Sequence, residues 1–217
     1  MSGDAELLER WQAGDEASAR DLLERYFPIL YRFFRNKIDG DVGDLIQQTL
    51  FACSRYRGEI HTSFRAWILT IARHELYREL RKRQRRLGGE DFDASVHCVV
   101  DSATSPFSAA AKAQQGRLLL RALRHLPAEL QVVLELHYWE DLSTKEMCEV
   151  LEIPQGTVKS RIRRAREQLE VALRSLAENP GEAETTIAGL ETWARELRGQ
   201  LGDAGGEPVS AADSVAG

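Results

Sequence analysis

The stretch that decides the fold is STKEMCEVLEIPQGTVKSRIRRAREQL, residues 143–169. It opens with a capping box, in which Ser143 caps a helix and the Glu146 side chain reaches back to the Ser143 backbone. Glu152-Ile153-Pro154 predicts a tight turn after that helix, and a longer helix is expected to begin near Gln155. A short helix, a turn of about three residues and a second helix are the pattern of a helix-turn-helix.

The second helix of this motif combines an apolar face with a basic face. Its apolar stripe consists of Val158, Ile162, Ala165 and Leu169. At about 100° per residue, the opposite face carries Lys159, Ser160, Arg163 and Arg164. Arginine can hydrogen-bond guanine O6 and N7 in a major groove, and Thr157 and Lys159 are expected to hold phosphates. A helical hairpin with a solvated basic face is the alternative, but residues 157–166 hold five Lys or Arg and no acid, which favours DNA.

The charge distribution supports a nucleic-acid partner more than the net charge does. The 217 residues carry a net charge of −5, which by itself opposes binding to a polyanion. However, residues 55–86 contain ten Lys or Arg and three acids, whereas residues 179–217 contain two Arg and seven acids. The chain therefore has two basic patches, at 55–86 and 157–166, within an otherwise acidic sequence.

The remaining periodicity is helical, and no alternating strand pattern is present. Apolar residues from Leu22 to Phe34 recur at spacings of three and four, with Pro28 expected to kink or split that helix. Asp41 is expected to cap a second helix, and Thr62 or Ser63 a third. Further helices are predicted for residues 118–126 and from Pro127 to Tyr138. The predicted fold class is all-α, with two small helical domains joined by a flexible linker and the helix-turn-helix in the second domain.

The helical pattern breaks off between the two domains and again near the C-terminus. Residues 88–108 contain Gly88-Gly89, four acids and Pro106, and this composition predicts the linker. We therefore divide the chain into a first domain (1–87), the linker (88–108), a second domain (109–178) and an extension (179–217). The extension is expected to form a short amphipathic helix and then a disordered tail. Its apolar stripe packs either on the second domain or on a partner as a regulatory element, and consists of Ile187, Leu190, Trp193, Ala194, Leu197 and Leu201.

The first basic patch lies on the predicted third helix, together with aromatic residues. Cations that follow a nucleic-acid backbone beside rings that stack on bases are typical of single-stranded DNA binding. We interpret Phe64 and Trp67 as core residues and leave Tyr77 open between core and DNA contact. The cations at the end of this helix are Arg78, Arg81, Lys82, Arg83, Arg85 and Arg86.

Several other classes of protein are disfavoured. The sequence has no glycine-rich phosphate loop, HExxH motif or nucleophile elbow, and its histidines are scattered, so we expect no enzyme and no cofactor. The three cysteines form no CxxC pair and are expected to be buried or incidental thiols, with no metal site. No stretch approaches the roughly 18 apolar residues of a membrane span, and the acidic N-terminus does not resemble a signal peptide. We expect a cytoplasmic protein without membrane insertion.

Three stretches resemble the extracytoplasmic-function (ECF) sigma factors, the small two-domain class of bacterial RNA polymerase sigma factors. DVGDLIQQT (41–49) resembles the polymerase-binding helix of that family, and FRAWILTIAR (64–73) resembles the segment that leads into −10 recognition. Residues 126–138 and 142–166 resemble its −35 binding domain. The resemblance covers residues from about 5 to 176, and residues 180–217 form a C-terminal extension beyond it.

The resemblance implies a role for individual residues. The polymerase-binding residues are Asp41, Asp44, Gln47 and Gln48. The resemblance places the −10 contacts at Arg73, Arg78, Arg81 and Lys82, and Tyr77 is kept beside them as a further candidate. It places the −35 contacts at Lys159, Ser160, Arg163 and Arg164, and Gln155 and Thr157, at the start of the same helix, are further candidates. The sequence departs from the family at Gly43 and Gln48, where an acid is often found, and at Arg78, where aspartate is common.

The resemblance also implies a function and partners. The expected function is that of a sigma factor, which binds core RNA polymerase and directs initiation at promoters through their −10 and −35 elements. The expected partners are core RNA polymerase and promoter DNA, and an anti-sigma factor is a candidate third partner. The alternative is a helix-turn-helix regulator that binds an operator without polymerase, which would not need the polar helix or the basic aromatic segment of the first domain.

Overall fold

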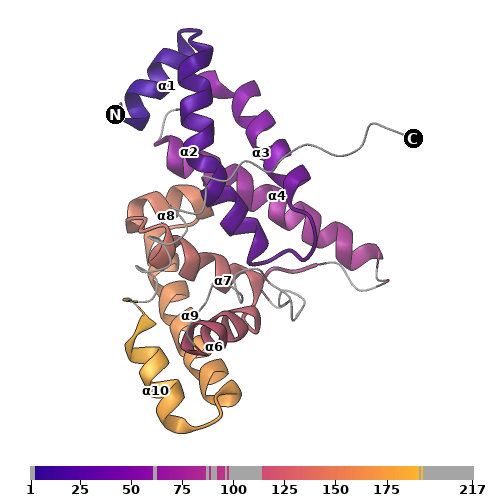
Figure 1. The fold of residues 1–217 in the computed structure, drawn as a ribbon, viewed down its shortest axis with the longest axis vertical. Helices are drawn as coiled ribbons and strands as arrows, with labels where there is room; N and C mark the ends of the chain where they lie inside the picture. The colour runs from indigo at the N-terminus through magenta and orange to yellow at the C-terminus, as the bar shows by residue number, and fades with distance from the viewer. Residues whose placement is uncertain are drawn as a thin grey trace, which may run out of the picture.

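The protein is built from helices. The computed structural model describes residues 3–60, 63–86, 88, 92–95, 97, 114–190 and 192, and no strand occurs among them. Figure 1 shows the helices in two groups, with those of the N-terminal half (residues 3–86) above those of the C-terminal half (residues 114–190). The predicted all-α class is confirmed. In the described part of the chain, no helix combines the length and the apolar character that a membrane crossing requires.

The N-terminal half contains four α-helices and a short 3-10 turn. They are α1 (Asp4–Gln12), α2 (Glu16–Arg35), α3 (Gly43–Arg55), η1 (Arg57–Glu59) and α4 (Phe64–Arg86). Asp15 caps α2 by accepting a hydrogen bond from the Ala17 amide at 3.0 Å. The Ser63 hydroxyl accepts one from the Ala66 amide at 3.2 Å and so caps α4, while Thr62 lies outside the described residues. Helix α1 was not predicted from the sequence, and it buries Leu7, Leu8 and Trp11.

Pro28 does not split helix α2. The helix runs without interruption from Glu16 to Arg35, so of the two predicted outcomes, a kink or a split, the split is wrong. A proline in a helix frees the carbonyl four residues earlier, and here that carbonyl belongs to Glu24, an exposed residue that water can reach. Tyr26 and Leu30, on either side of the proline, are both buried in the core, so packing anchors both parts of the helix.

The C-terminal half contains the predicted helix-turn-helix. Its elements are α6 (Gln114–Arg124), α7 (Ala128–Leu134), the π-helical turn η2 (Glu135–Trp139), α8 (Thr144–Leu151), α9 (Gln155–Leu176) and α10 (Pro180–Ala188). The capping box at α8 is confirmed, because the Glu146 carboxylate accepts from the Ser143 amide at 2.9 Å and Ser143 Oγ accepts from the Glu146 amide at 3.3 Å. In α9, the predicted stripe is buried at Val158, Ala165 and Leu169 and half-buried at Ile162.

Helix α10 belongs to the core of the C-terminal half. Asn179 caps it by accepting from the Glu182 amide at 3.0 Å. Ala183 and Leu190 are buried, and Leu190 packs in a cluster with side chains of α6 and α9. The start of the predicted apolar stripe therefore forms an additional helix on the second domain. The later members of that stripe, from Trp193 onward, lie outside the described residues.

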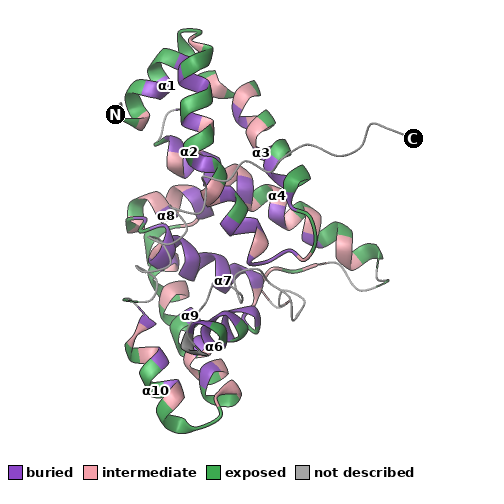
Figure 2. Ribbon diagram, in the orientation of Figure 1, coloured by how far each residue is buried: buried purple, intermediate pink, exposed green. Residues whose placement is uncertain are grey.

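The two halves share one hydrophobic core. The largest cluster of buried side chains runs from Leu7 in α1 to Val158 in α9, and Figure 2 shows buried residues where α4, α7 and α8 meet. The side chains that the C-terminal half contributes are Ala128, Val132, Val133, Leu136, Leu142, Met147, Val150, Leu151 and Val158. This direct packing was not predicted, because the linker composition indicated two separately folded domains.

A small part of the predicted linker is described, and it contacts the C-terminal half. The carbonyl of Ala94 accepts a hydrogen bond from the Glu129 amide at 2.9 Å, and that of His97 accepts from the Ala128 amide at 3.0 Å. These two amides belong to the first turn of α7 and have no partner within the helix. The rest of residues 88–108, apart from Gly88, residues 92–95 and His97, lies outside the described part.

Two of the three cysteines are described. Cys53 is buried and Cys148 is half-buried, as expected for incidental thiols, and Cys98 lies outside the described residues. Burial raises the pKa of the Cys53 thiol to about 12. Cys53 therefore carries almost no thiolate at neutral pH and is unreactive.

Ser143→Ala should lower the free energy of unfolding, because it weakens the start of helix α8. The substitution removes the acceptor for the Glu146 amide, and losing an N-cap side chain costs about 1 kcal/mol of unfolding free energy. Urea denaturation followed by circular dichroism measures the change, with Ser143→Asp as a control that retains a capping oxygen. Equal stability of wild type and Ser143→Ala would contradict the role of the capping box.

Removal of residues 179–217 should lower the midpoint of thermal unfolding by several degrees, because it uncovers the apolar side chains of α6 and α9 that α10 buries. The matched control is a chain ending at residue 192, which lacks the tail but keeps α10 and Leu190. If the chain ending at Glu178 melts at the wild-type temperature, α10 does not contribute to the core as the structure indicates.

Candidate nucleic-acid interface

The exposed face of α9 carries the residues predicted to contact a DNA duplex. Gln155, Lys159 and Ser160 are exposed, Arg163 and Arg164 continue the same face one turn later, and Thr157 is half-buried at the helix start. Because these positions are three and four apart, the structure brings them together on one side of the helix. The opposite side packs on α6, α7 and α8. The predicted face is therefore available to a groove-sized partner.

Hydrogen bonds and ion pairs distinguish the cations of α9 from one another. Arg163 Nε lies 3.8 Å from the Glu167 carboxylate, and both side chains are largely exposed, so this pair is weak and can be exchanged for a DNA contact. Arg161 behaves differently, because its guanidinium lies 3.0 Å from the Glu129 carboxylate and ties α9 to α7. Arg161 thus contributes to packing, a role that the basic run in the sequence did not reveal.

The four residues predicted to bind polymerase lie together on the outer side of α3. Asp41, Asp44, Gln47 and Gln48 are all exposed. The Asp41 carboxylate also accepts from the Gly43 amide at 2.8 Å and so fixes the start of the helix. This polar surface is formed by α3 and by Asp41, which lies just before the helix.

An apolar groove adjoins the polar surface of α3 and was missed from the sequence. It has a volume of about 470 Å³ and is lined by residues of α2 and α3: Phe27, Gly43, Ile46, Gln47, Leu50, Phe51 and Ser54. The Phe51 side chain is 68% exposed, which is unusual for a phenylalanine on a helix. The signal was present in the sequence, because Phe51 falls three and four residues after Gln48 and Gln47, on the polar face of α3.

The residues predicted to contact the −10 element separate into two groups. Arg78, Arg81 and Lys82 are exposed near the end of α4. Arg73 and Tyr77 instead face the C-terminal half. Arg73 donates to the Leu151 carbonyl at 3.3 Å and forms an ion pair with Glu152, in the turn of the helix-turn-helix.

Tyr77 and the earlier aromatic residues of α4 are part of the packing. Burial raises the pKa of Tyr77 to about 12, and its ring centroid lies 6.4 Å from that of Phe92. Phe64 is buried and Trp67 packs against the same core, so their interpretation as core residues is confirmed. In this structure the Tyr77 side chain packs against the hydrophobic core.

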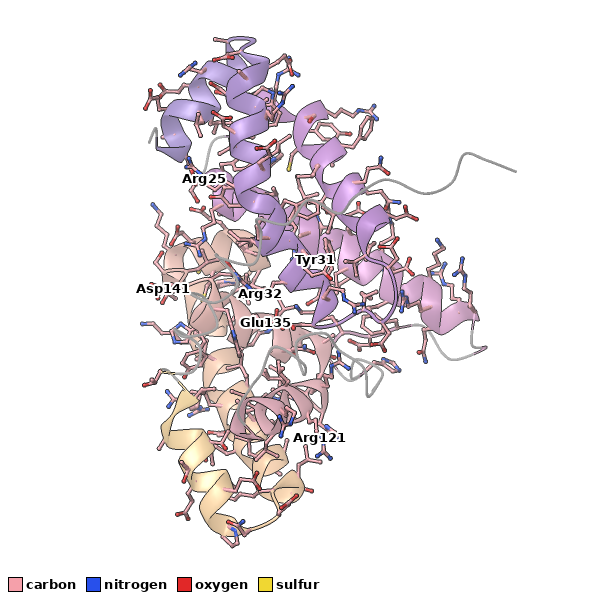
Figure 3. The ribbon with its side chains drawn as sticks, viewed as in Figure 1. Arg25, Tyr31, Arg32, Arg121, Glu135 and Asp141 are labelled. Atoms are coloured by element: carbon pink, nitrogen blue, oxygen red, sulfur yellow. The ribbon has the colours of Figure 1, made fainter. Side chains whose placement is uncertain are left out.

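A group of buried charges joins the two halves, and the sequence analysis did not foresee it. Arg32 pairs with Glu140, and Lys37 pairs with Glu135. The Arg65 guanidinium lies 3.3 Å from the second oxygen of the Glu140 carboxylate. Figure 3 shows Arg32 and Glu135 at the junction of the two groups of helices. In the sequence, these buried charges were indicated only by single acidic and basic residues within otherwise apolar helical stretches.

Burial and pairing act in opposite directions on these charges. Burial raises the pKa of the Glu135 carboxyl, and the nearby Lys37 ammonium opposes that rise. Gln131 also donates to the Glu135 carboxylate at 3.3 Å, and Lys37 donates to the Phe33 carbonyl at 2.8 Å. At the interface edge, partial burial alone would raise the pKa of Glu152, but its hydrogen bonds with His74 and Arg73 lower it.

Each half of the chain is similar to a known protein family. Residues 14–86 match the family Sigma-70 region 2, and residues 116–169 match the family Sigma-70, region 4. The ECF RNA polymerase sigma-E factor of Haemophilus influenzae is 28% identical over 194 residues, which are 80% of this chain and 96% of that protein. The protein of the same name in Escherichia coli K12 is 28% identical over 178 residues, which are 77% of this chain and 92% of that protein.

A solved structure has the same fold. It is the Bartonella quintana sigma factor RpoE in complex with the anti-sigma factor NepR, which has a TM-score of 0.52 and 24% sequence identity. The similarity covers 70% of this chain and 92% of that one. With two Sigma-70 regions matched in order on one chain, and with the helix-turn-helix geometry within the second, the chain belongs to the sigma-70 family and is similar to its ECF sigma factors.

Proposed function

We propose that this protein is an ECF-type sigma factor that binds core RNA polymerase and directs transcription initiation at specific promoters. The observation that carries the proposal is the presence of Sigma-70 regions 2 and 4 on one chain, with an exposed basic helix in the second. In this proposal, residues 1–87 bind polymerase and the −10 element, and residues 109–178 bind the −35 element. Residues 88–108 link the two domains, and residues 179–217 extend the second.

Polymerase docking is assigned to the outer side of α3. Asp41, Asp44, Gln47 and Gln48 supply polar contacts, and the neighbouring groove with Phe51 supplies an apolar one. An exposed aromatic side chain beside polar groups is typical of the central residues of a protein interface. This combination supports a protein partner for α3 rather than DNA, because two of its four polar residues are acids.

DNA binding is assigned to α4 and α9. Arg78, Arg81 and Lys82 provide exposed positive charge for the opened −10 strand, and Arg73 and Tyr77 are proposed to join them once they leave the C-terminal half. The exposed face of α9 is proposed to enter the major groove of the −35 duplex. Because one chain makes both contacts, binding at one promoter element raises the effective concentration of the other domain at the second element. Two modest affinities therefore combine into a higher overall affinity.

The proposal accounts for features that the operator-binding alternative does not. Residues 14–86 match Sigma-70 region 2, and a regulator that acts without polymerase would not need such a region. The chain is proposed to contribute binding rather than catalysis, and to act in the cytoplasm, where the polymerase is. The Bartonella sigma factor of the same fold is bound by an anti-sigma factor, which keeps such a protein as a candidate third partner here.

In vitro transcription tests the proposal directly. The purified protein is mixed with core polymerase and fragments of the source genome, and the transcript starts are mapped. A shared pair of sequence elements upstream of the starts is the expected result. Specific footprints formed by the protein alone, together with no initiation when core polymerase is added, would favour the operator-binding regulator.

Arg163→Ala should weaken use of a cognate promoter without unfolding the protein, because the side chain points away from the buried stripe of α9. Losing a bidentate base contact costs about 1–3 kcal/mol and relaxes specificity at one position, whereas Lys159→Ala, at a phosphate contact, should weaken all sequences alike. Transcription on promoter variants over a salt titration measures both. A wild-type rate for Arg163→Ala under all these conditions would show that the base contact is misassigned.

Asp44→Arg should abolish co-elution with core polymerase in size-exclusion chromatography, because it reverses a charge in the centre of the α3 surface. The matched control is Glu184→Arg, which makes the same change in net charge at an exposed position of α10. Loss of co-elution in both variants would point to a general charge effect, and retention in Asp44→Arg would place the docking surface elsewhere.

A further inference from the structure

One cation of helix α9 is held by an acid of a neighbouring helix. Arg161 is half-buried, whereas the other four Lys or Arg residues of the basic patch 157–166 are exposed. Its guanidinium lies 3.0 Å from the Glu129 carboxylate, and the two side chains are 30% and 12% exposed. In the Arg163–Glu167 pair of the same helix, the charged atoms are 3.8 Å apart and both side chains are largely exposed. A long, exposed pair contributes little, whereas a short, partly buried one is a strong charge-assisted hydrogen bond.

Arg161 borders the face of α9 that is proposed to enter the major groove. Residues three and four apart are neighbours on a helix, and Arg161 lies four residues after Thr157 and three before Arg164. Both of those residues are candidates for DNA contacts. Arginine is a common donor to DNA phosphates, so without Glu129 the Arg161 guanidinium would be available for a phosphate at the edge of the groove.

The backbone of Glu129 is held in place by contacts other than its pair with Arg161. Glu129 lies in the first turn of α7, and its amide donates to the Ala94 carbonyl at 2.9 Å. The adjacent residues of the same helix, Ala128 and Leu130, are buried in the two hydrophobic clusters. Helix α7 also packs directly against α9. The Glu129 carboxylate is therefore carried by a packed helix and can hold Arg161 at a defined position.

We propose that Glu129 is a positioning residue for DNA recognition, which binds Arg161 and keeps its guanidinium away from the DNA phosphates. Both residues belong to the C-terminal half, so the pair acts within the domain that is proposed to bind the −35 duplex. Helix α9 then makes one phosphate contact fewer than its cations would allow, and the exposed residues of its outer face make the contacts that remain. This inference rests on the proposed function for the identity of the DNA target, whereas the ion pair itself does not.

The salt dependence of DNA binding counts phosphate contacts, so it reports directly on Arg161. Each phosphate that a protein cation neutralises on duplex DNA steepens the fall of log affinity with log salt concentration by about 0.9. Glu129→Gln keeps the shape of the side chain, removes its charge and releases Arg161. One added contact should steepen the slope by about 0.9, so the gain in affinity should shrink by about 3.5-fold when the salt concentration rises from about 50 to about 200 mM.

The experiment measures binding of the full chain to a short random-sequence duplex by fluorescence anisotropy over a salt titration. Arg161→Gln is made alone and together with Glu129→Gln, and the double variant leaves neither partner as an unpaired charge. Glu170→Gln is the matched control, because it makes the same change in net charge in an exposed pair within α9. Lys159→Gln removes a cation that is proposed to bind a phosphate, so it should make the slope shallower by about 0.9.

The expected result is a steeper slope for Glu129→Gln alone, and the wild-type slope for Arg161→Gln, for the double variant and for Glu170→Gln. A shallower slope for Arg161→Gln alone would show that Arg161 already binds a phosphate in the wild type. An unchanged slope for Glu129→Gln would show that the released guanidinium adds no contact. Either of these two results would overturn the proposal.

Two further outcomes are also decisive. If circular dichroism shows that Glu129→Gln is misfolded, Arg161→Gln alone decides, because the proposal requires it to keep the wild-type slope. If Lys159→Gln also keeps that slope, α9 does not contact the duplex and the proposal is wrong. Failure of the wild type to initiate transcription with core polymerase would refute the proposed function, while the salt dependence on random-sequence DNA would still test the role of Glu129.

Discussion

The structure depends on one interaction, the pairing of cations from α2, from the segment just after it and from α4 with the two acids that follow α7. An unpaired charge inside a protein is costly, so each partner is tolerated only in the presence of the other. Apolar side chains from Ala128 to Val158 surround these pairs and join the core of the N-terminal half. The ion pairs thereby specify how the two halves meet, because a shift of the interface would leave charges buried alone.

Much of the fold could be predicted from local signals. The capping box at Ser143, the turn before Gln155 and the apolar stripe of α9 depend on neighbours within a few residues, and all three are present in the structure. The split at Pro28, one of two predicted outcomes, does not occur, because the packing that keeps α2 continuous involves residues distant in sequence. The shared core was missed for the same reason. A linker composition indicates that two segments can separate, and it contains no information on whether they do.

The site could be predicted only in part, and the limits have a physical origin. A helical wheel separates the outside from the inside of a helix, so the exposed positions of α3 and α9 were found correctly. It cannot tell which exposed face will meet another domain. Neither the resemblance that placed Arg73 at the −10 element nor the basic run 157–166 indicated that Arg73 would contact the turn before α9, or that Arg161 would pair with Glu129.

The π turn at Glu135–Trp139 makes the interface sensitive to chain length. A π turn contains one residue more than the α-helical turn it replaces, so deleting a single residue there would restore regular α-helix. The following segment would then rotate by about 100°, carrying Glu140 away from Arg32 and Arg65 while leaving the helix-turn-helix itself unchanged. Among related proteins, a one-residue gap at this place in an alignment would therefore separate chains that can form this interface from chains that cannot.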